Sequence, residues 1–149
     1  MKRILLPLSG QEAHEAVVPL VSALARHTGA TLRLLRVYPV PDVIMQSPDL
    51  VGARARVVAY ADQQMDSLTA EGRRYLETVE AQLDGVPTER VVRFGDPTRE
   101  ILTEADAFDA DLIALATTTR SRLRSAFVPS VAERVARQAG TRALVLTAE

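Results

Sequence analysis

The sequence predicts one α/β domain in which a parallel sheet carries helices on both faces. Short apolar runs, typical of strands buried on both sides, alternate with longer stretches whose apolar residues recur every three or four positions. Strands that alternate with helices form parallel sheets, because each crossover helix returns the chain to the same edge. No change of composition divides the 149 residues, so we expect a single domain over 1–149.

The first half of the chain contains two of the expected strands and two of the expected helices. Gly29 is a natural stop for the first helix, and Leu20 is expected on its inner face. Gly72 lies inside the second helix and indicates a kink or a weak point, and Tyr60 is expected on that helix's inner face. In order, the elements are a strand over 4–8, a helix over 11–27, a strand over 31–40, a connection over 39–50 and a helix over 49–84.

The second half contains three more strands and two helices with marked ends. Asp96 fits the N-cap of a helix that has Pro97 at its first position. Ser130 and Glu133 form the S-x-x-E pattern of a capping box at the start of the last helix, which Gly140 closes. The elements are strands over 89–94, 112–116 and 143–147 and helices over 97–108 and 131–139.

Composition and charge exclude several classes of function. The formal net charge of −1 gives no general attraction to nucleic acid or to an acidic membrane, and no cysteine is present for disulfides or thiol chemistry. The apolar run over 4–8 is shorter than the roughly 7–15 residues of a signal sequence. No segment approaches the roughly 18 apolar residues of a membrane span. We therefore expect a cytoplasmic protein that binds neither nucleic acid nor membrane.

The strongest candidate for a ligand site is the stretch from Asp111 to Glu133. It is predicted as a buried strand, a polar loop and a capped helix start, and open α/β sheets bind ligands where such strands end. Ser130 has two interpretations: it only caps the last helix, or the same helix start also faces a phosphate. The loops at Ser9-Gly10 and Val37-Tyr38 are expected at the same edge of the sheet.

Arginines are concentrated around this stretch in an otherwise near-neutral chain. A guanidinium group suits phosphate or carboxylate, because it can donate two parallel hydrogen bonds. Two interpretations stay open, an anion site and a set of solvated side chains on a loop. A nucleic-acid patch is disfavoured, because no aromatic residues for base stacking are interleaved. The arginines are Arg120, Arg122, Arg124, Arg134, Arg137 and Arg142.

Residues arranged for catalysis are scarce. Ser9 lacks the G-x-S-x-G pattern of a nucleophile elbow, and His14 is expected as an exposed helix residue rather than as its base. Asp109 and Asp111 flank the start of a strand, at the edge opposite the ligand loops, and are expected to be solvated. No pair of carboxylates falls at the ligand edge, so we expect no catalytic and no metal site.

Three patches together resemble the universal stress protein family over nearly the full chain. The opening KRILLPLSGQEA is similar to the start of that family's first strand, and GDPTREIL is similar to its G-D-P-x-x-x-I-L. DLIALATTTRSRLRSAFVPSVAERV, with the later ALVL, is similar to its last strand–helix–strand unit. The resemblance implies a five-stranded parallel sheet of order 3-2-1-4-5. It also implies a homodimer through the last strand, here Arg142, Ala143, Leu144, Val145 and Leu146.

Some members of that family bind ATP through G-x-x-G-x9-G-[S/T] after the fourth strand. The resemblance implies that Ala116, Thr119 and Pro129 stand where the glycines would be, and that only Ser130 is kept. Glycine lets a phosphate approach the backbone closely, whereas proline has no N–H to donate. We therefore expect ATP to bind weakly or not at all, and no other cofactor.

Two further positions follow from the resemblance. Ser9 replaces an aspartate that supports the nucleotide in binding members, and Val37 matches the position whose backbone holds adenine. The complete set of candidate nucleotide- or anion-binding residues is Ser9, Gly10, Val37, Ala116, Thr117, Thr119, Arg120, Arg122, Ser130 and Val131.

These observations favour a non-catalytic stress-response or regulatory protein that is dimeric and acts on an unidentified protein partner. The alternative is a nucleotide- or anion-binding sensor that uses Arg120, Arg122 and Ser130. A phosphoryl-transfer or hydrolytic enzyme is disfavoured, because the expected ligand edge offers no carboxylate for a metal ion.

Overall fold

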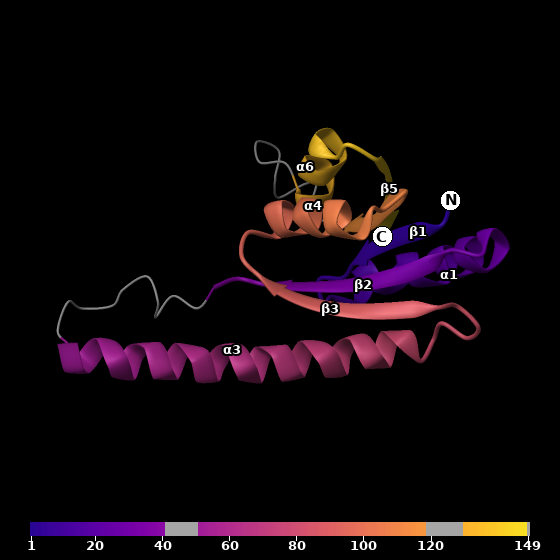
Figure 1. Cartoon of the computed structure of the whole chain (residues 1–149). Helices are drawn as coiled ribbons and strands as arrows, with labels where there is room; N and C mark the ends of the chain where they lie inside the picture. The colour runs from indigo at the N-terminus through magenta and orange to yellow at the C-terminus, as the bar shows by residue number, and fades with distance from the viewer. Residues whose placement is uncertain (41–50, 119–129, 149) are drawn as a thin grey trace.

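Five parallel strands form one sheet (Figure 1). The strands are β1 Arg3–Pro7, β2 Thr31–Tyr38, β3 Thr88–Phe94, β4 Leu112–Thr118 and β5 Arg142–Ala148. The computed structural model describes residues 1–40, 51–118 and 130–148. Across the sheet the order is β3-β2-β1-β4-β5, so the predicted order is confirmed. The chain builds outward from β1 to β3 and then returns to the other side of β1, so the winding reverses between β1 and β4.

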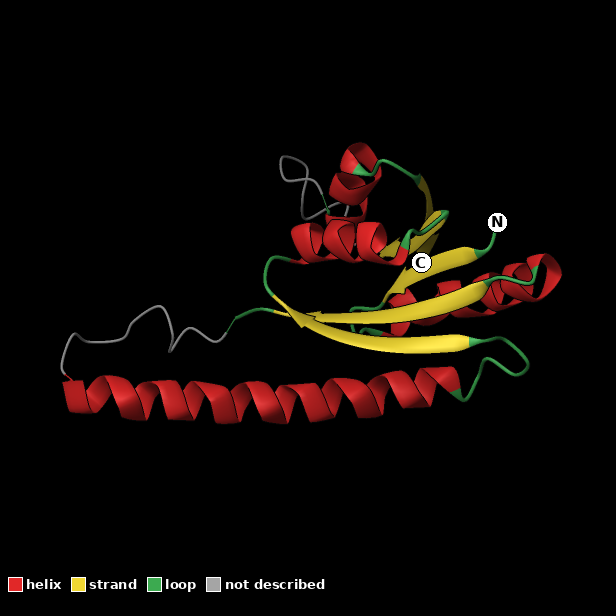
Figure 2. Cartoon of the chain, in the orientation of Figure 1, coloured by secondary structure: helices red, strands yellow, loops and turns green. Residues whose placement is uncertain are grey.

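Helices cover both faces of this sheet (Figure 2). They are the 3₁₀ helix η1 Glu12–Ala16 and the α-helices α1 Val17–Thr28, α3 Val51–Glu80, α4 Pro97–Phe108 and α6 Val131–Gln138. Leu34 of β2 packs in the core under α1 and α3, whereas the next residue, Leu35, packs in the core under α4 and α6. Successive strand residues point to opposite faces, which explains why the central strands β1 and β4 carry apolar residues in succession. Within the described ranges, no helix is long and apolar enough to cross a membrane.

The first predicted helix is divided into a 3₁₀ turn and an α-helix. Pro19 explains the boundary, because proline fits the first turn of a helix but cannot donate the hydrogen bond that would extend it back to Glu15. Leu20 is 47% exposed, so its predicted place on the inner face is wrong. The buried face of α1 consists instead of Val17, Val18, Val21, Ser22 and Ala25.

The long helix α3 runs beside β3 and continues past the carboxyl ends of the strands (Figure 1). It is uninterrupted at Gly72 and drawn without a bend, so the predicted kink is wrong, whereas the predicted weak point stays a prediction (Figure 1). A Cβ atom at Gly72 would lie 2.9 Å from Val92 Cγ2 and 3.0 Å from Tyr38 Cε2, so the glycine allows the helix to approach the sheet closely. Tyr60, in the first third of α3, is 53% exposed rather than on the inner face.

A buried glutamate of α4 joins two strands through ion pairs. The Glu104 side chain is 5% exposed, and its oxygens lie 2.7 Å from Arg33 Nη1 and 2.5 Å from Arg93 Nη1. Arg33 also pairs with Glu89, and Arg93 with Glu100. Hydrogen bonds to Glu100 and Glu104 raise the pKa of the Arg93 guanidinium, so that it stays charged. The network fastens α4 to β2 and β3.

Asp111 anchors the N-terminal end of β1. Its Oδ2 accepts hydrogen bonds from the backbone amides of Lys2 at 2.6 Å and Arg3 at 2.9 Å. These two amides lower the pKa of the Asp111 carboxyl. Asp109 pairs with the Arg3 side chain. Both aspartates are exposed, as expected, but they also hold the start of β1 beside β4.

Candidate functional site

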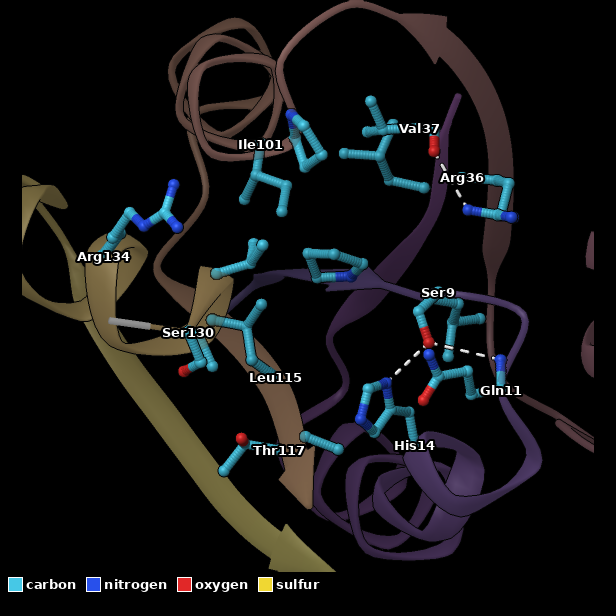
Figure 3. A pocket seen from close by; sticks show the side chains of 17 residues that line it. Ser9, Gln11, His14, Arg36, Val37, Ile101, Leu115, Thr117, Ser130 and Arg134 are labelled. Carbon is cyan, nitrogen blue, oxygen red and sulfur yellow. Dashed lines mark hydrogen bonds between the residues drawn. The ribbon is translucent and has the colours of Figure 1, made fainter. Parts of the chain in front are cut away.

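A cavity of about 420 Å³ lies at the carboxyl ends of β1, β2 and β4, next to the start of α6 (Figure 3). This is the edge where the winding of the sheet reverses, the place where open α/β sheets bind ligands. Its apolar wall includes Leu35 and Val37 of β2, Ile101 of α4 and Leu115 of β4. The polar groups lie around this wall, at the start of α6, at Ser9 and His14, and at Arg36.

The structure brings most of the predicted site residues together. Gly10 is beside the cavity but does not line it. Thr119, Arg120 and Arg122 lie outside the described residues. The predicted residues that line the cavity are Ser9, Val37, Ala116, Thr117, Ser130 and Val131.

The start of α6 forms one polar end of the cavity. Ser130 is the N-cap, and its Oγ accepts a hydrogen bond from the Glu133 amide at 3.1 Å, as the capping box predicts. The Thr117 hydroxyl is buried and has no hydrogen-bond partner among the described residues. Arg134 also lines the cavity. A helix N-terminus attracts negative charge, so this end suits an anionic group.

Ser9 and His14 meet at another side of the cavity. Ser9 Oγ lies 2.6 Å from His14 Nδ1 and accepts a hydrogen bond from the Gln11 amide. The direction of the bond between Oγ and Nδ1 follows the tautomer of the His14 ring. His14 is half-buried, so the expectation of an exposed residue is wrong, and burial lowers its pKa. Its Nε2 has no partner in the described part of the chain, so no third group orients the ring as in a catalytic triad.

Arg36 is a cavity residue that the sequence analysis missed. Its Nη1 donates a hydrogen bond to the Val37 carbonyl oxygen at 3.0 Å, and its Cζ lies 4.3 Å from the centroid of the Tyr38 ring. Gly10 has a φ of +82°, and a Cβ there would lie 3.4 Å from Arg36 Nη2. A lone arginine in a strand gives no sequence signal. Arg36 lies at the cavity because the end of β2 and the loop at Gly10 come together in the fold.

The cavity lining is cationic rather than acidic. Among the described residues that line it, two are arginines, Arg36 and Arg134, and none is aspartate or glutamate. The described ranges also contain no group of three or more His, Cys, Asp or Glu side chains placed to hold a metal ion. Arginines, hydroxyls and a helix N-terminus are donors, and metal ions require acceptors. The site therefore fits an organic anion with an apolar body.

The comparison of the sequence with known families gives one match. A sequence model described as the universal stress protein family matches residues 1–146. The chain belongs to the universal stress protein family. No curated protein matches the sequence of this universal stress protein.

Solved structures with the same fold include other members of the family. The hypothetical protein MJ0577 superposes with a TM-score of 0.80 at 21% identity, covering 99% of this chain and 96% of that one. A universal stress protein in complex with cAMP has a TM-score of 0.69 at 17% identity, with coverages of 98% and 96%. A family member from Burkholderia pseudomallei has a TM-score of 0.70 at 23% identity, with coverages of 97% and 95%. At these identities the likeness concerns the fold.

Proposed function

We propose that this universal stress protein is a non-catalytic regulatory protein of the stress response whose pocket takes a nucleotide-sized anionic ligand. The observation that carries the proposal is the pocket itself. It has about 420 Å³ of space at the reversal of the sheet, an apolar wall and a helix N-terminus beside Arg134. The cAMP complex of a relative with the same fold supports a nucleotide as the ligand class.

The character of the lining supports binding without chemistry. Phosphoryl transfer and hydrolysis use a metal ion held by carboxylates or a base that activates the nucleophile. Among the described lining residues there is no carboxylate, and Ser9 and His14 have no third residue to orient the ring. We therefore assign the pocket a sensing role, in which ligand binding changes the affinity of the protein for a partner protein.

The phosphate-binding segment supports weak binding of ATP. Ala116, Thr119 and Pro129 replace glycines of the motif that ATP-binding relatives carry. Each lost charge-assisted contact weakens binding by roughly 1.5–3 kcal/mol, so two or three losses change a micromolar dissociation constant to a millimolar one. Arginine side chains can recover part of this loss, but they are less preorganised than a cradle of backbone amides.

Calorimetric titration of the nucleotide-free protein with Mg-ATP tests this proposal. We expect a dissociation constant near millimolar and no appearance of ADP during the titration. A variant that combines Ala116→Gly, Thr119→Gly and Pro129→Gly is expected to bind ATP at least about tenfold more tightly, because it restores the backbone contacts. Ala70→Gly, on the exposed face of α3, is the control for the general effect of glycine. Micromolar binding by the unmodified protein, or its turnover of ATP, would contradict the proposal.

We also propose a homodimer through β5. This strand is at the edge of the sheet, paired only with β4 among the described strands. Its outer edge presents unpaired backbone groups beside the apolar residues Leu144, Val145 and Leu146, and such an edge is prone to pair with another strand. Light scattering at tens of micromolar protein is expected to give twice the chain mass. The mass of one chain at that concentration would refute the dimer.

A further inference from the structure

The two ends of the pocket differ in chemistry and are well separated. Figure 3 shows Arg134 and Arg36 on opposite sides of the cavity. Arg36 is on β2, and α6 follows β4, two strands further across the sheet, which corresponds to roughly 10 Å. The start of α6 attracts the anionic group of a ligand. A nucleotide bound there would place its base against the apolar wall beside β2.

The backbone acceptor at the β2 end already accepts a hydrogen bond from an arginine. Leu35 O accepts a hydrogen bond from the Leu8 amide at 2.8 Å, toward β1. Alternate carbonyl groups of a strand point in the same direction, so Val37 O points past the end of β1 to the cavity. Arg36 Nη1 donates to this oxygen at 3.0 Å. An amino group that approached Val37 O would have to share this oxygen with a cationic donor.

The Arg36 guanidinium is held in place with most of its hydrogen-bonding capacity unused. The Tyr38 ring packs on it at 4.3 Å, and Gly10 lies beside it on the loop after β1. No carboxylate of the described residues forms an ion pair with Arg36. The carboxylate of Glu15 instead accepts a hydrogen bond from the Tyr75 hydroxyl at 2.7 Å. Of five N–H donors, one is used in the described structure. The β2 end of the pocket therefore offers several cationic donors.

We propose that the pocket selects nucleotides with a 6-oxopurine base, such as guanine, over adenine nucleotides, and that Arg36 determines this preference. Guanine presents two acceptors, O6 and N7, on one edge, and the arginine fork matches them with two hydrogen bonds. Adenine presents an amino donor at the same edge, which faces the donors of Arg36. This inference rests on the proposed binding of a nucleotide in the pocket, and it adds a reason at the base end for weak binding of ATP.

Calorimetric titration with GMP and AMP tests the preference, because the two ligands carry the same phosphate and sugar. We expect the unmodified protein to bind GMP at least about tenfold more tightly than AMP, the discrimination of one bidentate contact. Arg36→Met keeps an apolar stem over Tyr38 but removes the donors, and it is expected to abolish the preference. Arg36→Lys keeps the charge without the fork and is expected to restore only part of it. Arg99→Met, an exposed arginine that does not line the cavity, is the control for net charge.

The outcomes separate this inference from the proposal on which it rests. Equal or tighter binding of AMP by the unmodified protein would overturn the 6-oxopurine preference and leave nucleotide binding intact. An unchanged preference in Arg36→Met would overturn the role of Arg36. No binding of either ligand up to millimolar concentration would overturn the nucleotide pocket as well. Thermal melting of each variant checks folding, and if Arg36→Met is unfolded, the GMP/AMP ratios of the unmodified protein and Arg36→Lys decide.

Discussion

Replacing Glu104 by alanine is expected to lower the free energy of unfolding by about 3 kcal/mol, since removing one partner from a buried ion pair leaves the other charges unpaired. The Glu104 carboxylate is 5% exposed and contacts both Arg33 and Arg93. Without it the two guanidinium groups would face each other across the space that the carboxylate leaves. Each keeps one other carboxylate, Glu89 or Glu100, which limits the loss.

Urea denaturation of the two single variants Glu104→Ala and Glu77→Ala measures this effect. Glu77 is the matched control, because it also pairs with an arginine of the sheet, Arg90 at 2.9 Å, but its side chain is 58% exposed. An exposed pair contributes less than about 1 kcal/mol, so Glu77→Ala is expected to change little. If the two variants were equally stable, the buried network would have no special role in fastening α4 to the sheet.

The strand order and the position of the ligand edge could be predicted from the sequence, because both follow from local patterns and a family resemblance. The apolar runs around Leu5, Leu34 and Ile113 are buried on both faces, as their composition indicates. Ser130 and Asp96 cap their helices as predicted, because capping requires only residues three positions apart. The features that the sequence predicts best are therefore local in the chain.

The features that escaped prediction depend on how the chain folds between the residues in contact. Glu104 is buried only because two arginines, 71 and 11 residues away, converge on it. His14 was expected on the surface of a continuous helix, but the 3₁₀ turn that precedes Val17 places it against Ser9. Arg36 lines the cavity where the end of β2 meets the loop at Gly10. None of these contacts has a periodic signature in the sequence.

Replacing Gly72 by valine is expected to destabilise the protein by about 1–3 kcal/mol, the usual cost of forcing extra atoms into a packed contact. The first added carbon alone would lie 2.9 Å from Val92 Cγ2 and 3.0 Å from Tyr38 Cε2. Gly72→Ala is expected to change stability less, because the better helix propensity of alanine, worth about 1 kcal/mol, offsets part of the crowding. Ala70→Val, on the exposed face of the same helix, is the control for the helix propensity of valine.

Thermal and urea denaturation of the three variants distinguish crowding from propensity. A loss of stability in Gly72→Val no larger than in Ala70→Val would show that α3 can move away from the sheet without cost. Crowding at Gly72 is also expected to change the pocket, through the position of the Tyr38 ring. Tyr38, the ring that crowding would displace, is the ring on which Arg36 packs. The long helix and the base end of the pocket thus share one aromatic side chain. A ligand that engages Arg36 is expected to protect Gly72→Val from thermal unfolding less than Ala70→Val, because a displaced Tyr38 ring weakens its binding.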